Sequence, residues 1–152
     1  MSLSSNDELI KVSKIKLEDK NSPRHAVFLN PKRIEHVKRR MDGGHVKNKT
    51  CADWMLSKPE IGDIFLELKG CNVEDAFHQL TAAVEYAKNN NLTTGDKIAA
   101  LILCTQHPGI STKIQRTMSA FVKKYKGPIH ARNRSGEFVF ENVLSFNGPD
   151  KL

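Results

Sequence analysis

An unbroken apolar run at residues 98–104 does most to limit the folds that this chain can adopt. A strand with one face in water alternates apolar and polar residues, whereas a strand covered on both faces is apolar throughout. Residues 97–104 are therefore predicted to form a strand buried on both faces, which Pro108 and Gly109 should end. Such a strand requires a layer of structure on each side, and this requirement favours an α/β domain.

Amphipathic helices are predicted before and after this strand. Asn72 can cap the first helix, which is expected to end near residues 89–91. Ser111 or Thr112 can cap the second, and a Gly-Pro pair at 127–128 should stop it. The apolar positions of the first helix recur at helical intervals: Val73, Ala76, Phe77, Leu80, Ala83, Val84 and Ala87. Those of the second also form one stripe: Ile114, Met118, Phe121, Val122 and Tyr125.

Three antiparallel strands are predicted ahead of the first helix. Residues 34–41 form the first strand, residues 42–44 a turn, and residues 45–56 the second strand. A proline and a glycine then interrupt the chain before the third strand at residues 63–69. Together these segments make an antiparallel meander.

The two ends of the chain are less regular. Residues 1–23 are polar apart from residues 9–17, whose pattern fits either an edge strand or a short helix. Residues 129–146 alternate weakly around a turn at residues 133–136 and are predicted to form a terminal hairpin.

The predicted fold is therefore α/β, with a mixed central sheet, an antiparallel meander, a crossover helix and helices on the faces of the sheet. Because a helix connects the third strand to the apolar strand, these two strands should be parallel. The 152 residues, 39% of them hydrophobic, are expected to form a single domain. It would comprise a polar N-terminal segment (1–23), a core (about 34–126) and a C-terminal hairpin (128–146). A homodimer formed through that hairpin is one further expectation.

The charge of the chain points toward polyanionic partners. Lys and Arg outnumber Asp and Glu by 24 to 17, a net charge of +7. The basic residues of the first predicted hairpin either steer a phosphate backbone or form a solvated strand face: Lys32, Arg33, Lys38, Arg39, Arg40, Lys47 and Lys49. The same two interpretations apply to a second group: Lys113, Arg116, Lys123, Lys124, Lys126, Arg132 and Arg134.

The compartment follows from what the chain lacks. Its longest apolar run is too short to span a bilayer, and its N-terminus lacks the layout of a secretion signal. Three widely spaced cysteines form neither a zinc-binding pair nor a disulfide framework, so buried, reduced thiols are expected. We expect a cytoplasmic protein that does not contact a membrane.

Candidate functional residues lie at the ends of the second and third predicted strands. Side chains alternate along a strand, so Glu67 and Lys69 should face one way, opposite to their apolar neighbours Ile64, Leu66 and Leu68. Asp53 brings a second carboxylate from the neighbouring strand. Charged residues inside strands are costly, and a divalent cation held by the two carboxylates would offset that cost.

These residues resemble the PD-(D/E)XK nuclease superfamily with its restriction-endonuclease-like core. The resemblance rests on Asp53, a spacer, the sequence Glu67-Leu68-Lys69 and a following helix that carries Gln79, within residues 34–104 or so. It implies a nuclease that hydrolyses phosphodiester bonds in DNA with Mg²⁺ or Mn²⁺ as cofactor. Asp53, Glu67 and the main-chain carbonyl of Leu68 would hold the metal. Lys69 would stabilise charge on the phosphate, and Gln79 would contact the site.

The chain also departs from that family. Ala52 stands where a proline often precedes the acid, and an upstream acidic ligand has only scattered candidates: Glu8, Glu18, Glu35 and Asp42. A salt bridge between Lys69 and the two carboxylates would explain the same pattern without a metal. An inactive nuclease-fold module that binds nucleic acid or a protein partner is therefore the alternative function. A site for a small phosphate compound is less favoured, because the sequence has no glycine-rich phosphate loop.

Overall fold

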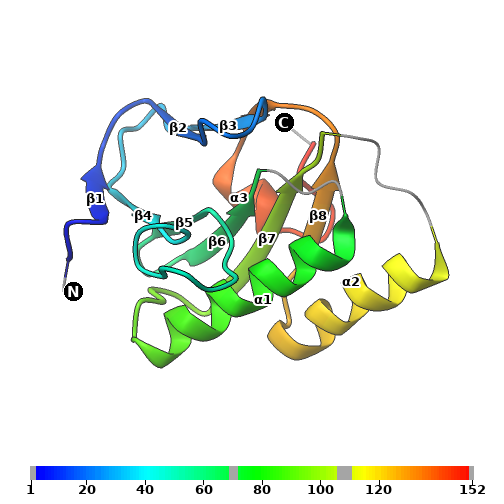
Figure 1. Cartoon of the computed structure of the whole chain (residues 1–152). Helices are drawn as coiled ribbons and strands as arrows, with labels where there is room; N and C mark the ends of the chain where they lie inside the picture. The colour runs from blue at the N-terminus through cyan, green and yellow to red at the C-terminus, as the bar shows by residue number, and fades with distance from the viewer. Residues whose placement is uncertain (1–2, 69–71, 106–110, 151–152) are drawn as a thin grey trace.

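The computed structural model describes residues 3–68, 72–105 and 111–150 (Figure 1). Its centre is a mixed sheet in the order β1-β4-β5-β6-β7-β8. The pairs β1·β4, β4·β5 and β5·β6 are antiparallel, whereas β6, β7 and β8 run parallel to one another. The strands span Asp7–Ile10 (β1), His36–Arg40 (β4), Trp54–Lys58 (β5), Gly62–Glu67 (β6), Lys97–Leu103 (β7) and Ile129–Arg132 (β8).

Further layers cover both faces of this sheet. The long helices α1 (Val73–Asn89) and α2 (Thr112–Tyr125) lie next to each other on one face (Figure 1). The other face packs against a smaller sheet, in the order β2-β3-β9, and the short helix α3 (Phe140–Val143). The strands of the smaller sheet span Lys14–Glu18 (β2), His25–Leu29 (β3) and Gly136–Phe138 (β9).

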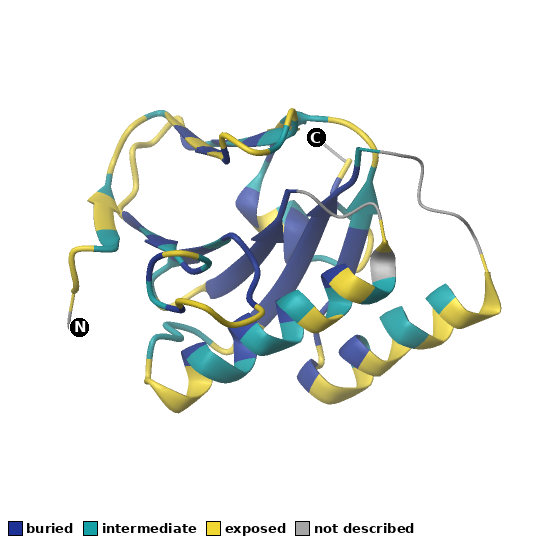
Figure 2. Cartoon of the chain, viewed as in Figure 1, coloured by how far each residue is buried: buried dark blue, intermediate teal, exposed yellow. Residues whose placement is uncertain are grey.

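Alternation along the central strands divides the core into two apolar layers. Phe65 of β6 packs with the residues of α1 and α2, while its neighbours Ile64 and Leu66 pack with β2, β3, β9 and α3. Strand β7 is buried from Ile98 to Leu103, and Figure 2 shows the central strands as the most buried part of the molecule. The prediction of an apolar strand covered on both faces is therefore confirmed.

Several other predictions are confirmed. Strands β4, β5 and β6 form the antiparallel meander, and α1 connects the parallel strands β6 and β7. The side chain of Asn72 accepts hydrogen bonds from the amides of Glu74 and Asp75, and that of Ser111 accepts one from Ile114. Helix α2 ends where Gly127 passes so close to the carbonyl oxygen of Ile98 that no Cβ would fit between them.

The second strand of the meander was predicted too long. The strand begins only at Trp54. The last contacts with it before the turn are hydrogen bonds from the amide of Met41 to the carbonyl of Asp53 and from the amide of Asp42 to the carbonyl of Ala52. Residues 43–51 then leave the sheet. Residues 47–50 are uniformly polar, and Asn48 has a left-handed φ of 60°, so this stretch has no face to bury.

The predicted C-terminal hairpin at residues 128–146 is wrong. Strand β8 pairs in parallel with β7 in the central sheet, whereas β9 pairs in parallel with β3 in the smaller sheet. The reason is apolar packing, because Phe138 of β9 lies against Phe28 of β3 with ring centroids 5.9 Å apart. The N-terminal region that was left open between strand and helix forms β1 and β2.

Candidate active site

Asp53 and Glu67 face each other at the ends of β5 and β6. The register pairs Trp54 with Leu66, so Asp53 lies opposite Glu67 at the next position of the ladder. Both side chains point toward the helices, because Met55 and Phe65, two residues further along each strand, belong to the layer packed against α1. Directly opposed side chains have Cβ atoms roughly 4.5–5.5 Å apart. The structure thus brings the two carboxylates together.

Both carboxylates are shielded from water, with exposed fractions of 2% for Asp53 and 1% for Glu67. The Oδ2 atom of Asp53 accepts a hydrogen bond of 2.8 Å from the amide of Leu68. This bond holds the side chain of Asp53 against the main chain directly after Glu67. Two facing carboxylates in a low-dielectric interior repel each other, so a positive charge next to them would stabilise the site.

Asp42 acts electrostatically on the thiol of Cys51, as Asp53 and Glu67 do. Burial raises the pKa of the Cys51 thiol to about 12, and repulsion from Asp42, Asp53 and Glu67 adds to that shift. Asp42 is held close by its amide, which donates to the carbonyl of Ala52 at 3.0 Å. The turn signal at residues 42–44 explained this acid in the sequence, and only the structure shows its electrostatic effect on Cys51.

The other upstream acids lie apart from it. Glu8, Glu18 and Glu35 are exposed, and two of them have ion-pair partners of their own. Lys16 lies 3.1 Å from Glu18, and Lys11 lies 4.0 Å from Glu35.

Helix α1 reaches the site through Gln79. Its main-chain carbonyl accepts a hydrogen bond of 2.9 Å from the amide of Ala52, the residue before Asp53. The side chain of Gln79 is partly buried. Tyr86, two helical turns further on, instead contacts the ring of His45, with centroids 5.9 Å apart. Of these two helix residues, Gln79 therefore lies nearer the carboxylates.

The remaining predicted site residues are Leu68 and Lys69. Lys69 lies outside the described residues. The carbonyl of Leu68 accepts a hydrogen bond of 2.5 Å from the hydroxyl of Ser22, in the segment between β2 and β3. A carbonyl oxygen has two lone pairs, so this bond leaves one for a second partner. Nothing in the sequence around Ser22 indicated this contact, since it joins residues 46 positions apart.

The donor set suits a hard divalent cation. Asp53, Glu67 and the Leu68 carbonyl offer only oxygen atoms, which Mg²⁺ and Mn²⁺ prefer over nitrogen and sulfur. Among the described residues, no three or more His, Cys, Asp and Glu side chains form a group able to hold a metal. Mg²⁺ does not require one, because it commonly uses one or two carboxylates and completes its shell with water and substrate phosphate.

Comparison with known proteins adds no relative. The chain matches no known family, no curated protein and no solved structure. Within the described part of the chain, no helix combines the length and the apolar character needed to cross a membrane.

Proposed function

We propose that this protein is a nuclease of the PD-(D/E)XK type that hydrolyses phosphodiester bonds in DNA with Mg²⁺ or Mn²⁺. The observation that carries the proposal is the facing pair Asp53 and Glu67 at the ends of neighbouring strands, with Leu68 bonded to Asp53. The order β4-β5-β6-α1-β7, with a crossover between parallel strands, supports a restriction-endonuclease-like core.

Each residue has a role in this proposal. Asp53, Glu67 and the carbonyl of Leu68 would hold the metal ion. When bound, the ion supplies a water of lowered pKa and offsets negative charge on the phosphate. Lys69 acts as a positioned cation, because neighbouring carboxylates favour the charged form of a lysine. Gln79 orients groups at the helix side of the site.

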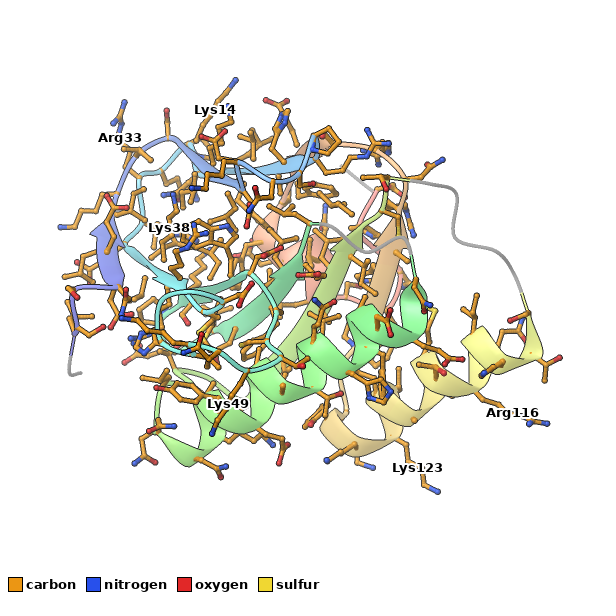
Figure 3. The ribbon with its side chains drawn as sticks, in the orientation of Figure 1. Lys14, Arg33, Lys38, Lys49, Arg116 and Lys123 are labelled. Atoms are coloured by element: carbon orange, nitrogen blue, oxygen red, sulfur yellow. The ribbon has the colours of Figure 1, made fainter. Side chains whose placement is uncertain are left out.

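The charge distribution favours a nucleic acid as substrate. Residues 1–50 contain 12 Lys and Arg against 6 Asp and Glu, whereas residues 51–105 contain 4 against 8. The acidic stretch includes Asp53 and Glu67, and basic residues precede and follow it. In Figure 3, Arg116 and Lys123 project outward from α2, and Arg33 projects outward from the segment between β3 and β4. Such surface cations attract the phosphate backbone without reading its sequence.

Cleavage assays test the proposal directly. Purified protein is incubated with single- and double-stranded DNA and RNA in Mg²⁺, Mn²⁺ or EDTA. We expect metal-dependent cleavage of DNA, and a loss of roughly 10²-fold or more in Asp53→Asn and Glu67→Gln. Glu60→Gln, at the exposed turn between β5 and β6, is the matched control and should cleave normally. Cleavage in EDTA, or full activity in both site variants, would overturn the assignment.

The second candidate function is an inactive nuclease-fold module. The burial of both carboxylates favours it, because substrate must reach groups with exposed fractions of only 2% and 1%. Thermal unfolding with and without Mn²⁺ separates the two functions. A working site binds the metal in the folded state only and raises Tm, whereas an inactive one leaves Tm unchanged.

A further inference from the structure

The segment between β2 and β3, residues 19–24, is fixed against the edge of the central sheet that carries the candidate site. The hydroxyl of Ser22 donates to the carbonyl of Leu68 at 2.5 Å. The Nε atom of Arg24 donates to the carbonyl of Cys104 at 2.7 Å. These carbonyls follow β6 and β7, so two parallel strands hold one connecting segment at their carboxyl ends.

An open polar cavity of about 350 Å³ lies along this segment. Lys20, Arg24 and His25 contribute to its wall, together with Ser22 and the two preceding acids, Glu18 and Asp19. Two hydrogen bonds connect the wall to the site: Ser22 to the carbonyl of Leu68, and the amide of Leu68 to Asp53, at 2.5 and 2.8 Å. The cavity is therefore a neighbour of the carboxylate pair.

The two acids of this wall have ion-pair partners, whereas Lys20 has none among the described residues. The guanidinium of Arg24 bonds only to main-chain carbonyls there, those of Cys104 and Thr105, so its charge is not neutralised. Asp19 lies 3.6 Å from the guanidinium of Arg40, and Glu18 lies 3.1 Å from Lys16. In contrast, the side chains of Lys20 and His25 make no hydrogen bond or ion pair with any residue that the structure describes. Lys20 is also exposed. The wall thus presents positive charge to an incoming ligand.

The positive charge continues beyond the cavity. Arg40 and Lys38 lie over the ring of Trp54, at 5.2 and 4.8 Å from its centroid. The indole of Trp54 donates to the carbonyl of Glu18 at 3.0 Å, which joins these basic residues to the cavity wall. Arg40 is offset by Asp19, so Lys38 extends the positive charge of Lys20 and Arg24 along this end of the sheet. Cations spread out in this way suit an extended polyanion better than a small anion.

We propose that Lys20, Arg24 and His25 form a phosphodiester-binding subsite that holds a DNA backbone phosphate next to the one at the carboxylate pair. The position of this subsite next to the cleaved bond rests on the proposed function. Its ability to bind DNA does not depend on cleavage. Lysine binds phosphate as a point charge and arginine through directed N–H groups. Ser22 is a positioning residue, since it fixes the segment to Leu68 rather than contacting DNA.

The salt dependence of DNA binding tests the subsite. A labelled DNA duplex is titrated with Asp53→Asn protein in EDTA and followed by fluorescence anisotropy between about 50 and 200 mM salt. Adding Lys20→Ala should weaken binding several-fold at low salt and reduce the slope of log Kd against log salt by about 1. Lys97→Ala is the matched control, because Lys97 is exposed at the start of β7, the end of the sheet opposite to the candidate site, and should leave the slope unchanged.

The outcomes separate the subsite from the nuclease proposal. An unchanged slope in Lys20→Ala, an equal change in Lys97→Ala, or no binding of DNA by the parent protein would each overturn the subsite, whatever the cleavage assay shows. If the salt slope of DNA binding depends on Lys20 but the protein cleaves no DNA, the subsite is supported and the nuclease proposal is refuted. Inorganic phosphate is the last probe. Displacement of DNA by far less phosphate than chloride at equal ionic strength would indicate a free-phosphate site and overturn the proposal.

Discussion

The carboxylate of Asp7 is the centre of a buried ionic network that attaches β1 to the rest of the sheet. Its Oδ2 atom accepts hydrogen bonds from Arg39 at 2.7 Å and from the amide of Ser4 at 2.8 Å. Its Oδ1 atom lies 2.6 Å from Nε2 of His45. The side chains of Asp7 and Arg39 are 1% and 0% exposed. Asp7→Asn therefore leaves a guanidinium buried without its counter-charge.

The expected cost is large. Removing one partner of a buried ion pair destabilises a protein by about 3–5 kcal/mol, a large share of the ~5–15 kcal/mol that keeps a typical domain folded. For a chain of this size, that cost lowers Tm by roughly 6–20 °C. The Nε and Nη2 atoms of Arg39 also lack hydrogen-bond partners among the described residues, so the carboxylate is the principal compensation for this charge.

Urea unfolding monitored by circular dichroism measures the effect. Lys14→Ala is the control, because its pair with Glu137 is exposed, and it should change the free energy of unfolding by about 0–1 kcal/mol. The double variant Asp7→Leu with Arg39→Met removes both charges and should recover most of the loss. A loss below about 1 kcal/mol in Asp7→Asn, with an unchanged m-value, would refute the reasoning.

Three further predictions concern pH, thiol chemistry and the helix. Burial lowers the pKa of His36 and His130 below the ordinary histidine value of 6.5, so the unfolded chain binds more protons under slightly acidic conditions. The free energy of unfolding should therefore be highest above that pH and fall below it, and a flat profile in urea titrations would contradict this. Cys51, with a pKa of about 12, should resist iodoacetamide at pH ~8 until the protein unfolds, and peptide mapping of the native protein would reveal any labelling. Gln79→Ala keeps the main-chain bond to Ala52, so its stability should change by less than about 0.5 kcal/mol while DNA cleavage slows. Equal cleavage by this variant and the parent would show that the side chain of Gln79 has no role in the site.

Local sequence patterns were sufficient to predict those helices and strands that are determined by their own residues. Helices α1 and α2 have capping residues and an apolar stripe, and β7 is apolar along its length. Alternation also predicted the two faces of β6, with Ile64 and Leu66 on one and Glu67 on the other.

Elements whose position depends on distant partners could not be predicted in this way. Strand β9 has three residues and pairs with β3, and the amide of His25 bonds to Ser135 across 110 positions of sequence. No local period encodes such a pairing, because it is selected by the packing of Phe138 in the second apolar layer. The contacts of Ser22 and Arg24 with the candidate site have the same origin.

The arrangement of charge suggests that substrate binding and cleavage can be separated by mutation. The facing carboxylates come from the acidic middle of the chain, whereas the cavity wall with Lys20 comes from its basic first third. The two parts meet through hydrogen bonds made by the main chain of Leu68. In a nuclease of this design, Asp53→Asn should lower kcat and leave DNA binding in EDTA intact or tighter, because it removes a negative charge that repels phosphate. Lys20→Ala should raise KM in a salt-dependent way with kcat nearly unchanged, since a backbone contact acts equally in the ground and transition states. Equal losses of kcat in both variants would show that the segment between β2 and β3 serves the reacting phosphate itself.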